Sequence, residues 1–237
     1  MSTPVKNTPI LVQKYGGTSV ATADQIRSVA KRVAAQRRQG KAVVVVVSAM
    51  GKTTDELVAL SRELSSHPAR REMDMLLHAG EIISASLLAI ALEEEGASAV
   101  SLTGSQAGMI TDETHMQARI EQVEGERILR HLTRGRVVVI TGFQGVSRRN
   151  EITTLGRGGS DTSAVAFAVG IGARQCEILT DVDGVYTADP RIVENPQKLS
   201  WCSYDEMLEM ASLGAKVLHS RSVEIARKFG IELIVSS

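Results

Sequence analysis

The chain has 237 residues, with 27 lysines and arginines against 27 aspartates and glutamates, so its formal net charge is zero. This balance gives no support for nucleic-acid binding, which needs clustered positive charge, and the apolar runs are far shorter than the roughly 20 residues that cross a bilayer. Only two cysteines, Cys176 and Cys202, and an N-terminus without an apolar leader predict a cytoplasmic protein with neither a membrane nor a nucleic-acid partner.

The first half of the chain alternates short strand-like runs with helical patterns. An apolar run at 10–12 is followed by apolar residues spaced three and four apart from Ile26 to Ala34, which predicts a helix. Residues 43–47 are apolar on both faces of the pleat, as in a central parallel strand covered by helices. Helices are predicted from about Thr54 and over 71–95.

The second half continues the alternation. Further strands are predicted at 99–102, 136–141, 177–179 and 231–235. A hairpin is expected between 143 and 155, and a last helix over 217–229. Strands that alternate with helices predict an α/β fold, a three-layer αβα sandwich with a mostly parallel central sheet. In such sheets ligands bind at the carboxyl ends of the strands, and the glycines cluster in the loops that follow the strands.

Two of these loops leave the first strands. Gly16 and Gly17 let the backbone approach an anion, with Lys14 adding a positive charge, although an ordinary tight turn is an equal alternative. Gly51 begins a Gly-Lys-Thr sequence that imitates the end of a P-loop. That motif needs a glycine five positions earlier, where Val46 stands, so we reject it. The loop keeps Ser48 and Thr54 as candidate hydroxyl donors to a ligand.

The third loop precedes a helix rich in small residues. Its glycines, including Gly158 and Gly159, expose backbone amides, and Arg157 can bind a carboxylate through two hydrogen bonds. Asp161 could orient cationic groups. A structural explanation, in which Ser160 or Asp161 caps the helix, is compatible with such a role.

The fourth loop, 180–191, lacks the spacing of a calcium-binding loop. Tyr186 and Arg191 suit adenine and phosphate contacts, but a plain surface loop is as good an explanation of this segment alone. Lys216 is a second isolated lysine before a helix, for which a solvated side chain is the simpler reading. The five histidines show no metal-ligand spacing, so no protein metal site is predicted. Glu81 interrupts an apolar helix and needs a partner if it is buried.

These segments, taken in order, resemble the amino acid kinase family, and within it the catalytic domain of the aspartate kinases. The resemblance covers about residues 11–235, nearly the whole chain. Each segment is weak alone, but the ordered set is specific. The matching segments are 14–20, 47–51, 80–81, 142–145, 156–161, 180–181, Tyr186, 189–191 and 214–219.

The resemblance implies a carbamate kinase-like fold and transfer of the γ-phosphoryl group of ATP to the side-chain carboxylate of L-aspartate. It implies Mg²⁺ bound with ATP, small-molecule substrates and a homo-oligomer. It also implies one kinase domain over 1–237, with an amino-acid-binding lobe over about 1–170 and a nucleotide-binding lobe over about 171–237.

The roles implied by the resemblance fall into four groups. The catalytic residues would be Lys14 and Asp161. Phosphate would be bound by Gly16, Gly17, Gly51, Gly158 and Gly159. The amino acid would be bound by Ser48, Ala49, Thr54, Glu81, Arg157 and Ser160. The nucleotide would be bound by Thr180, Asp181, Tyr186, Arg191 and Lys216.

Two alternatives stay open at this point. The same mechanism could serve another amino acid or small carboxylate, because the fold is shared by kinases of different acceptors. The chain could also be a non-catalytic subunit that only partners a kinase. Aspartate kinases usually continue into small regulatory domains, so we expect this chain, which stops at Ser237, to be insensitive to feedback by lysine and threonine.

Overall fold

A computed structural model describes residues 8–187, 193–212 and 217–237. Six strands form one sheet in which every neighbouring pair is parallel, in the order β10-β9-β1-β2-β6-β3. The bounds of these strands, in chain order, are β1 Ile10–Tyr15, β2 Ala42–Val47, β3 Ala99–Leu102, β6 Val137–Thr141, β9 Gln175–Leu179 and β10 Glu232–Ser236.

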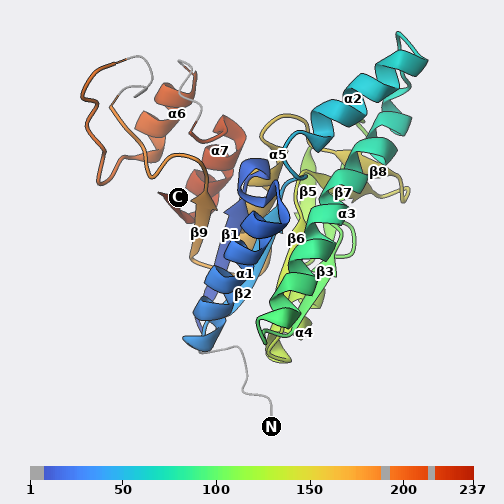
Figure 1. The fold of residues 1–237 in the computed structure, drawn as a ribbon. Coiled ribbons are helices and arrows are strands. Elements are labelled where there is room, and N and C mark those ends of the chain that lie inside the picture. Colours follow the sequence, from blue (N-terminus) through green and yellow to red (C-terminus); the bar gives the residue numbers. More distant parts are fainter. Residues whose placement is uncertain (1–7, 188–192, 213–216) are drawn as a thin grey trace.

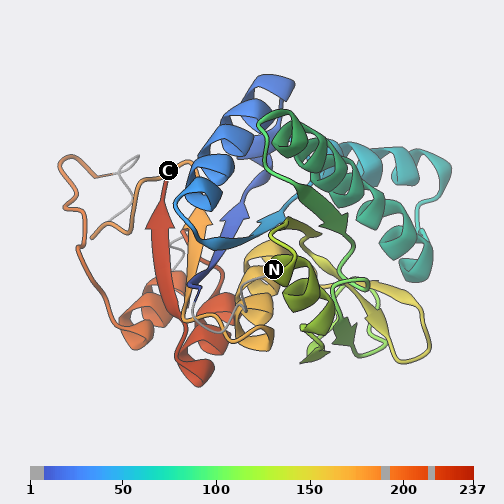
Figure 2. The same cartoon turned by 90° about the horizontal axis from the view of Figure 1, so that it is seen from below.

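Helices cover both faces of this sheet and complete three layers (Figures 1 and 2). Helices α1 and α3 pack on one face, and α5, with α7 beside it, packs on the other. The predicted α/β sandwich is therefore confirmed. The helical bounds are η2 Gly17–Val20, α1 Ala23–Arg38, α2 Thr53–Leu64, α3 Arg70–Glu94, α4 Glu126–Thr133, α5 Gly159–Gly170, α6 Tyr204–Ser212 and α7 Ser220–Phe229.

The valine-rich strand β2 is buried along its whole length and lies between β1 and β6. Its side chains alternate between the two cores, with Val43, Val45 and Val47 facing the α1 and α3 layer. Val44 and Val46 face the α5 layer. Burial on both faces is what favours the continuous β-branched run, so the prediction of a central strand was correct.

A local sequence signal explains where helix α1 of the first layer begins, and packing against the sheet explains why α3 is apolar. Helix α1 starts with a capping box, in which Thr22 accepts a hydrogen bond from the Gln25 amide and the Gln25 side chain accepts one from Thr22. Helix α3 is the one helix of the described residues long and apolar enough to cross a membrane, judged by length and composition alone. Its inner face packs against β2, β3 and β6, as in the core helix of a folded domain.

A second sheet, in the order β5-β4-β7-β8, flanks the first and was only half predicted. Strands β7, Gln144–Ser147, and β8, Ile152–Thr154, form the predicted hairpin. Strands β4, Met109–Thr111, and β5, Ile120–Val123, were missed because they are very short.

Two helix starts also differ from the prediction. Helix α7 begins at Ser220, three residues after the predicted start at Val217. The N-cap of helix α5 is Gly158, whose φ of 68° is left-handed, so the alternative in which Ser160 or Asp161 caps this helix does not hold.

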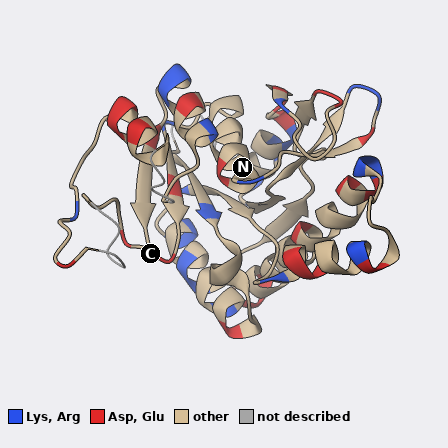
Figure 3. Ribbon diagram, turned by 90° about the horizontal axis from the view of Figure 1, so that it is seen from above, with Lys and Arg blue, Asp and Glu red and all other residues tan. Residues whose placement is uncertain are grey.

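The strand order reverses between β1 and β9, because the chain moves from β1 toward β2 but later returns to β9 on the other side. Such a switch point opens a crevice at the carboxyl ends of the strands. Figure 3 looks onto that end of the molecule and shows acidic and basic residues interspersed, mainly on the outer helices and loops. The loops of this edge contain the candidate site.

Candidate active site

An ion pair lies at the centre of the carboxyl edge. Lys14, one residue from the end of β1, places its Nζ atom 2.7 Å from Oδ1 of Asp161 in the first turn of α5. Both side chains are largely buried, with exposed fractions of 12% and 14%. A paired lysine in this position can still turn its remaining donors toward an anion above the sheet. The structure thus brings together the two residues predicted to be catalytic.

The glycine loop after β1 touches the loop after β2. The amide of Gly51 donates a hydrogen bond to the carbonyl of Gly17, at 3.0 Å. A Cβ atom on Gly17 would lie only 2.7 Å from the carbonyl oxygen of Ala49, so this close approach requires glycine. Gly16 faces Lys14, whose Nζ would lie 3.5 Å from a Cβ there. Of the predicted phosphate-binding glycines, Gly16 therefore lies next to Lys14, while Gly17 and Gly51 join the two loops.

Glu81 is buried in α3, with only 3% of its surface exposed. Its Oε1 accepts a hydrogen bond from the amide of Ala49 at 3.2 Å, whereas Oε2 has no partner among the described residues. Burial raises the pKa of this carboxyl group from 4.5 to about 8, and the hydrogen bond opposes the rise. An unsatisfied buried carboxylate oxygen is the group that an ammonium ligand would complete.

A hydrogen bond from helix α3 holds the loop after β2 in place. The hydroxyl of Ser84 donates to the carbonyl of Ser48 at 2.7 Å. Ser48 and Thr54 are each half-buried near this loop, where their hydroxyl groups can reach a ligand at the edge. Sequence reasoning missed Ser84, whose only signal is a serine at the spacing of the buried positions of α3.

The glycine loop before α5 meets the end of β6. Gly142 lies so close to Ser160 that a Cβ atom at position 142 would be 2.8 Å from the Cβ of Ser160. The Ser163 hydroxyl accepts a hydrogen bond from the Phe143 amide at 2.9 Å. Gly158 is left-handed and packs against the ring of His219, leaving no room for a side chain. The sequence led us to assign no site role to Ser163, or to His219 beyond its place in the matching segment 214–219.

Arg157 extends into solvent between these glycines, and Gly159 is the first residue of α5. A helix N-terminus presents backbone amides and a partial positive charge. Lys14 and the amides at the start of α5 therefore give the edge two sources of positive character beside Asp161, and Arg157 adds a third charge in the preceding turn.

Three of the predicted nucleotide residues, Thr180, Asp181 and Tyr186, follow β9, which pairs with the other side of β1. Tyr15 is in register with Leu179, so Thr180 follows β9 directly beside the first glycine loop. The hydroxyl of Thr180 donates to Asp181 at 2.9 Å, and that of Tyr186 donates to Asp183 at 2.6 Å. The hydrogen bond from Tyr186 and the ion pair with Lys198 lower the pKa of Asp183. Arg191 and Lys216 lie outside the described residues.

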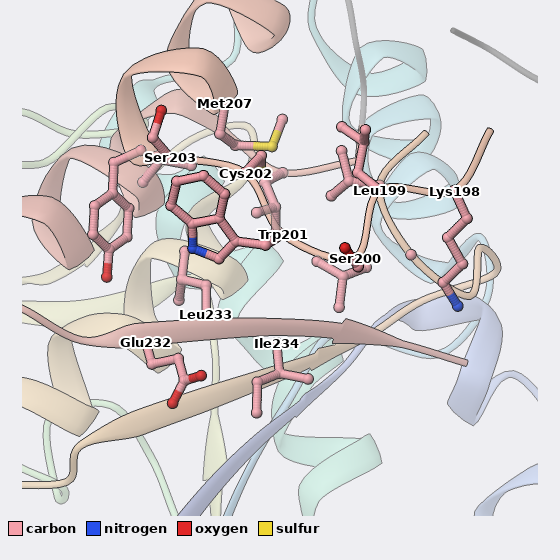
Figure 4. A pocket seen from close by; sticks show the side chains of 16 residues that line it. Lys198, Leu199, Ser200, Trp201, Cys202, Ser203, Met207, Glu232, Leu233 and Ile234 are labelled. Atoms are coloured by element: carbon pink, nitrogen blue, oxygen red, sulfur yellow. The ribbon is translucent and has the colours of Figure 1, made fainter. Parts of the chain in front are cut away.

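A cavity of about 500 Å³ lies farther out, between the loop that follows β9 and the outer strand β10 (Figure 4). The indole of Trp201 and the side chain of Met207 stand over one face of β10, where Leu233 points toward them. No predicted site residue within the described ranges lines this cavity. It is therefore separate from the Lys14 and Asp161 centre.

Comparison with known proteins was made at the levels of family, sequence and structure. The model of the amino acid kinase family matches residues 9–237. An aspartokinase from Bacillus sp. (strain MGA3) is 56% identical over 96% of this chain, and so is one from Mycobacterium tuberculosis. These alignments cover 56% and 54% of the relatives, so the chain spans about half the length of the curated relatives it matches.

Solved structures give the same result for the fold. The crystal structure of aspartate kinase from Synechocystis has a TM-score of 0.84 and 52% identity, covering 96% of this chain and 37% of that one. Aspartokinase III from E. coli, in complex with aspartate and ADP, has a TM-score of 0.87 and 28% identity, covering 96% of this chain and 62% of that one. UMP kinase from Ureaplasma parvum has a TM-score of 0.68 and 16% identity, and the match covers 98% of this chain and 90% of that one. At this identity the similarity shows the fold alone.

Proposed function

Because the chain belongs to the amino acid kinase family, we propose that it transfers the γ-phosphoryl group of ATP to the side-chain carboxylate of L-aspartate. The products are ADP and 4-phospho-L-aspartate, an acyl phosphate. Support comes from relatives named aspartokinase that are 52% to 56% identical over 96% of this chain. The observation that carries the proposal is the Lys14–Asp161 ion pair. Lys14 belongs to the strand β1, which pairs with β2 on one side and with β9 on the other.

The proposed chemistry needs charge and positioning more than it needs a base. A carboxylate acceptor is already ionised at neutral pH, so no proton has to be removed before attack. The obstacle is to bring one anion onto the phosphates of another. Lys14 would contact the transferring phosphoryl group and stabilise the charge that develops on its oxygens, while Asp161 holds the lysine in place. The amides of Gly16 and Gly17 would bind the same phosphates.

The acceptor would lie on the β2 and β6 side of Lys14. Glu81 would receive the ammonium group of the amino acid on its unsatisfied Oε2. Arg157 would bind the α-carboxylate through two parallel hydrogen bonds. The remaining contacts would come from the loop residues Ser48, Ala49, Thr54 and Ser160, with phosphate contacts from Gly51, Gly158 and Gly159.

The nucleotide would lie on the β9 side, contacted by Thr180, Asp181 and Tyr186, with Arg191 and Lys216. This division corresponds to an amino-acid-binding lobe over about 1–170 and a nucleotide-binding lobe over about 171–237. Lys14 stands at the meeting point, because β1 pairs with β2 on one side and with β9 on the other. The two substrates would thus approach the same lysine from opposite sides.

Magnesium would bind together with ATP. The described residues include no group of three or more His, Cys, Asp or Glu side chains set to hold a metal ion. Asp161 is the carboxylate placed to contact such an ion, or its water ligands, beside Lys14. The ion would supply positive charge that offsets the negative charge of the phosphates.

A direct assay tests the proposed reaction. Purified protein, MgATP and L-aspartate are incubated with hydroxylamine, which traps an acyl phosphate as a hydroxamate. Turnover is expected, and the Lys14→Ala variant should lose at least about 100-fold, the usual effect of removing one stabilising donor. Wild-type turnover no higher than that of Lys14→Ala would contradict the proposal, and a better acceptor in a panel of other amino acids and small carboxylates would overturn the choice of aspartate.

We further propose that the protein is a cytoplasmic homo-oligomer. The outer face of α3 supports self-association, because Met75, Ile83, Leu87 and Ile90 are all exposed along it. Two copies of α3 crossing antiparallel at the middle of this stripe would place the arginines at 70–71 opposite the glutamates at 94–95 of the second copy. Such a contact is both apolar and complementary in charge.

Light scattering after size exclusion tests this contact. Ile83→Glu together with Ile90→Glu should convert the oligomer to a monomer. Phe229→Glu, which changes an exposed apolar residue on α7, is the matched control and should leave the mass unchanged. A monomeric wild type, or a double variant with unchanged mass, would refute the α3 contact.

A further inference from the structure

Asp74 is a fully buried carboxylate that the proposed reaction does not use. It lies on α3, and its two oxygens accept four close contacts from three residues. Oδ2 lies 2.6 Å from Nδ1 of His115, and the Thr154 hydroxyl donates to Oδ1 at 2.5 Å. The amide of Met116 donates to both oxygens, at 3.1 and 3.2 Å. Asp74 therefore fastens the loop before β5 and the end of β8 to α3.

The backbone at this contact is strained. Met116 has a φ of 70°, in the left-handed region that residues with a side chain rarely adopt. Its amide is the one that points at the Asp74 carboxylate. A costly conformation persists only where its surroundings over-determine it, and the buried carboxylate supplies that constraint.

The fastened segment leads directly to Arg157. Thr154 ends β8 three residues before Arg157, and its carbonyl accepts a hydrogen bond from the amide of Ala118 at 2.9 Å. Gly156 is left-handed, and the carbonyl of Met116 lies 3.0 Å from where its Cβ would be. The loop held by Asp74 therefore packs directly against the turn that contains Arg157.

Asp74 and Glu81 are seven residues apart on the same helix, which is two turns and about 10 Å along one face. Glu81 contacts the loop after β2 directly, whereas Asp74 holds the end of β8, the strand that precedes the Arg157 turn. One rigid helix thus connects both ends of the proposed acceptor site.

We propose that Asp74 is a positioning residue that fixes the Arg157 turn relative to Glu81, and thereby supports binding of the acceptor between them. This inference rests on the proposed function, in which Glu81 binds the ammonium group and Arg157 binds the α-carboxylate of the same amino acid. Asp74 itself touches neither substrate.

Two variants and one matched control test the role of Asp74. Asp74→Asn places an amide near the Met116 amide, and Thr154→Val removes only the hydroxyl link. Thr153→Val removes the neighbouring hydroxyl of β8, which is equally buried and bonds to Thr111 at 2.6 Å instead. Both Asp74→Asn and Thr154→Val should raise KM for aspartate about tenfold, as expected for one disrupted buried hydrogen bond, with KM for MgATP nearly unchanged. Thr153→Val should leave both KM values nearly unchanged.

Hydrogen exchange gives a readout that does not depend on activity. Amides in 155–158 should exchange faster in Asp74→Asn and Thr154→Val than in wild type or Thr153→Val. Equal effects of all three variants on exchange, or equal changes in both KM values, would overturn the positioning role. A wild type without turnover on aspartate would refute the proposed function alone, because the exchange comparison would still decide the link from Asp74 to the Arg157 turn.

Discussion

Glu81 occupies an environment that favours the protonated acid, since burial raises its pKa to about 8. An ammonium ligand requires the carboxylate. The fraction of protein ready to bind therefore increases as the pH rises through about 8. We expect KM for aspartate to fall between about pH 6.5 and pH 8.5, while KM for MgATP changes little over that range. Initial rates at several pH values measure both constants, and a KM for aspartate that is flat or rises with pH would contradict this role.

The raised pKa of Glu81 should also make the free energy of unfolding depend on pH. The folded pKa lies above the unfolded value of 4.5, so between these values the folded state binds more protons. The free energy of unfolding therefore loses a contribution as the pH rises from about 4.5 to about 8. Glu81→Gln removes the ionisation, so its stability relative to wild type should increase over this range. Urea unfolding at about pH 5 and pH 8.5 measures the difference, and the idea fails if that difference is independent of pH.

Not every residue of the site was accessible from the sequence. Lys14, Glu81, Arg157 and Asp161 carry recognisable signals, because a charge beside glycines or inside an apolar helix is unusual. Asp74 carries the same signal as Glu81, a carboxylate among apolar residues of one helix, but it was not singled out. Its partners come from distant segments whose approach no local pattern encodes.

At the scale of elements, the loop after β1 packs closely against the loop after β2 because position 17 is a glycine. A methyl group on Gly17 would lie 2.7 Å from the Ala49 carbonyl oxygen and 3.2 Å from that of Gly51, both rigid backbone atoms. Gly17→Ala should destabilise the fold by about 1 to 3 kcal/mol through overpacking. Gly16→Ala is the matched control, because its methyl group would make an ordinary contact at 3.5 Å with the flexible Lys14 side chain.

Urea denaturation of the two variants checks the comparison. The midpoint should fall clearly for Gly17→Ala and little for Gly16→Ala, although both variants should lose activity if the loop binds phosphate. Equal stability of the two variants would show that the contact between the loops relaxes without cost.

The elements that sequence reasoning found are those with a strong period. The continuous valines of β2 and the apolar spacing of α1 predict their structures because burial repeats along them. Strands β4 and β5 have three and four residues, too few for any period to show. The side-chain cap considered for α5 is absent because the left-handed Gly158 occupies the N-cap position, and glycine spacing does not reveal the sign of φ.

At the scale of the molecule, the proposed lobes share one sheet. Strand β9 of the second lobe pairs with β1 of the first over Val12 to Tyr15, and β10 pairs only with β9. We therefore expect one cooperative unfolding transition in urea, followed by far-UV circular dichroism and by hydrogen exchange in β2 and β9. Two separated transitions, with β9 and β10 exchanging first, would instead show that the lobes unfold independently.

Trp201 is the single tryptophan of the chain, and 77% of it is exposed in the wall of the cavity beside β10. The same wall contains Gly184 and Val185, from the loop that carries Tyr186. An indole in water emits at long wavelength, and its emission shifts to shorter wavelength when neighbouring groups exclude solvent. The molecule therefore carries an intrinsic optical reporter, without any label, of movements of the loop that follows β9.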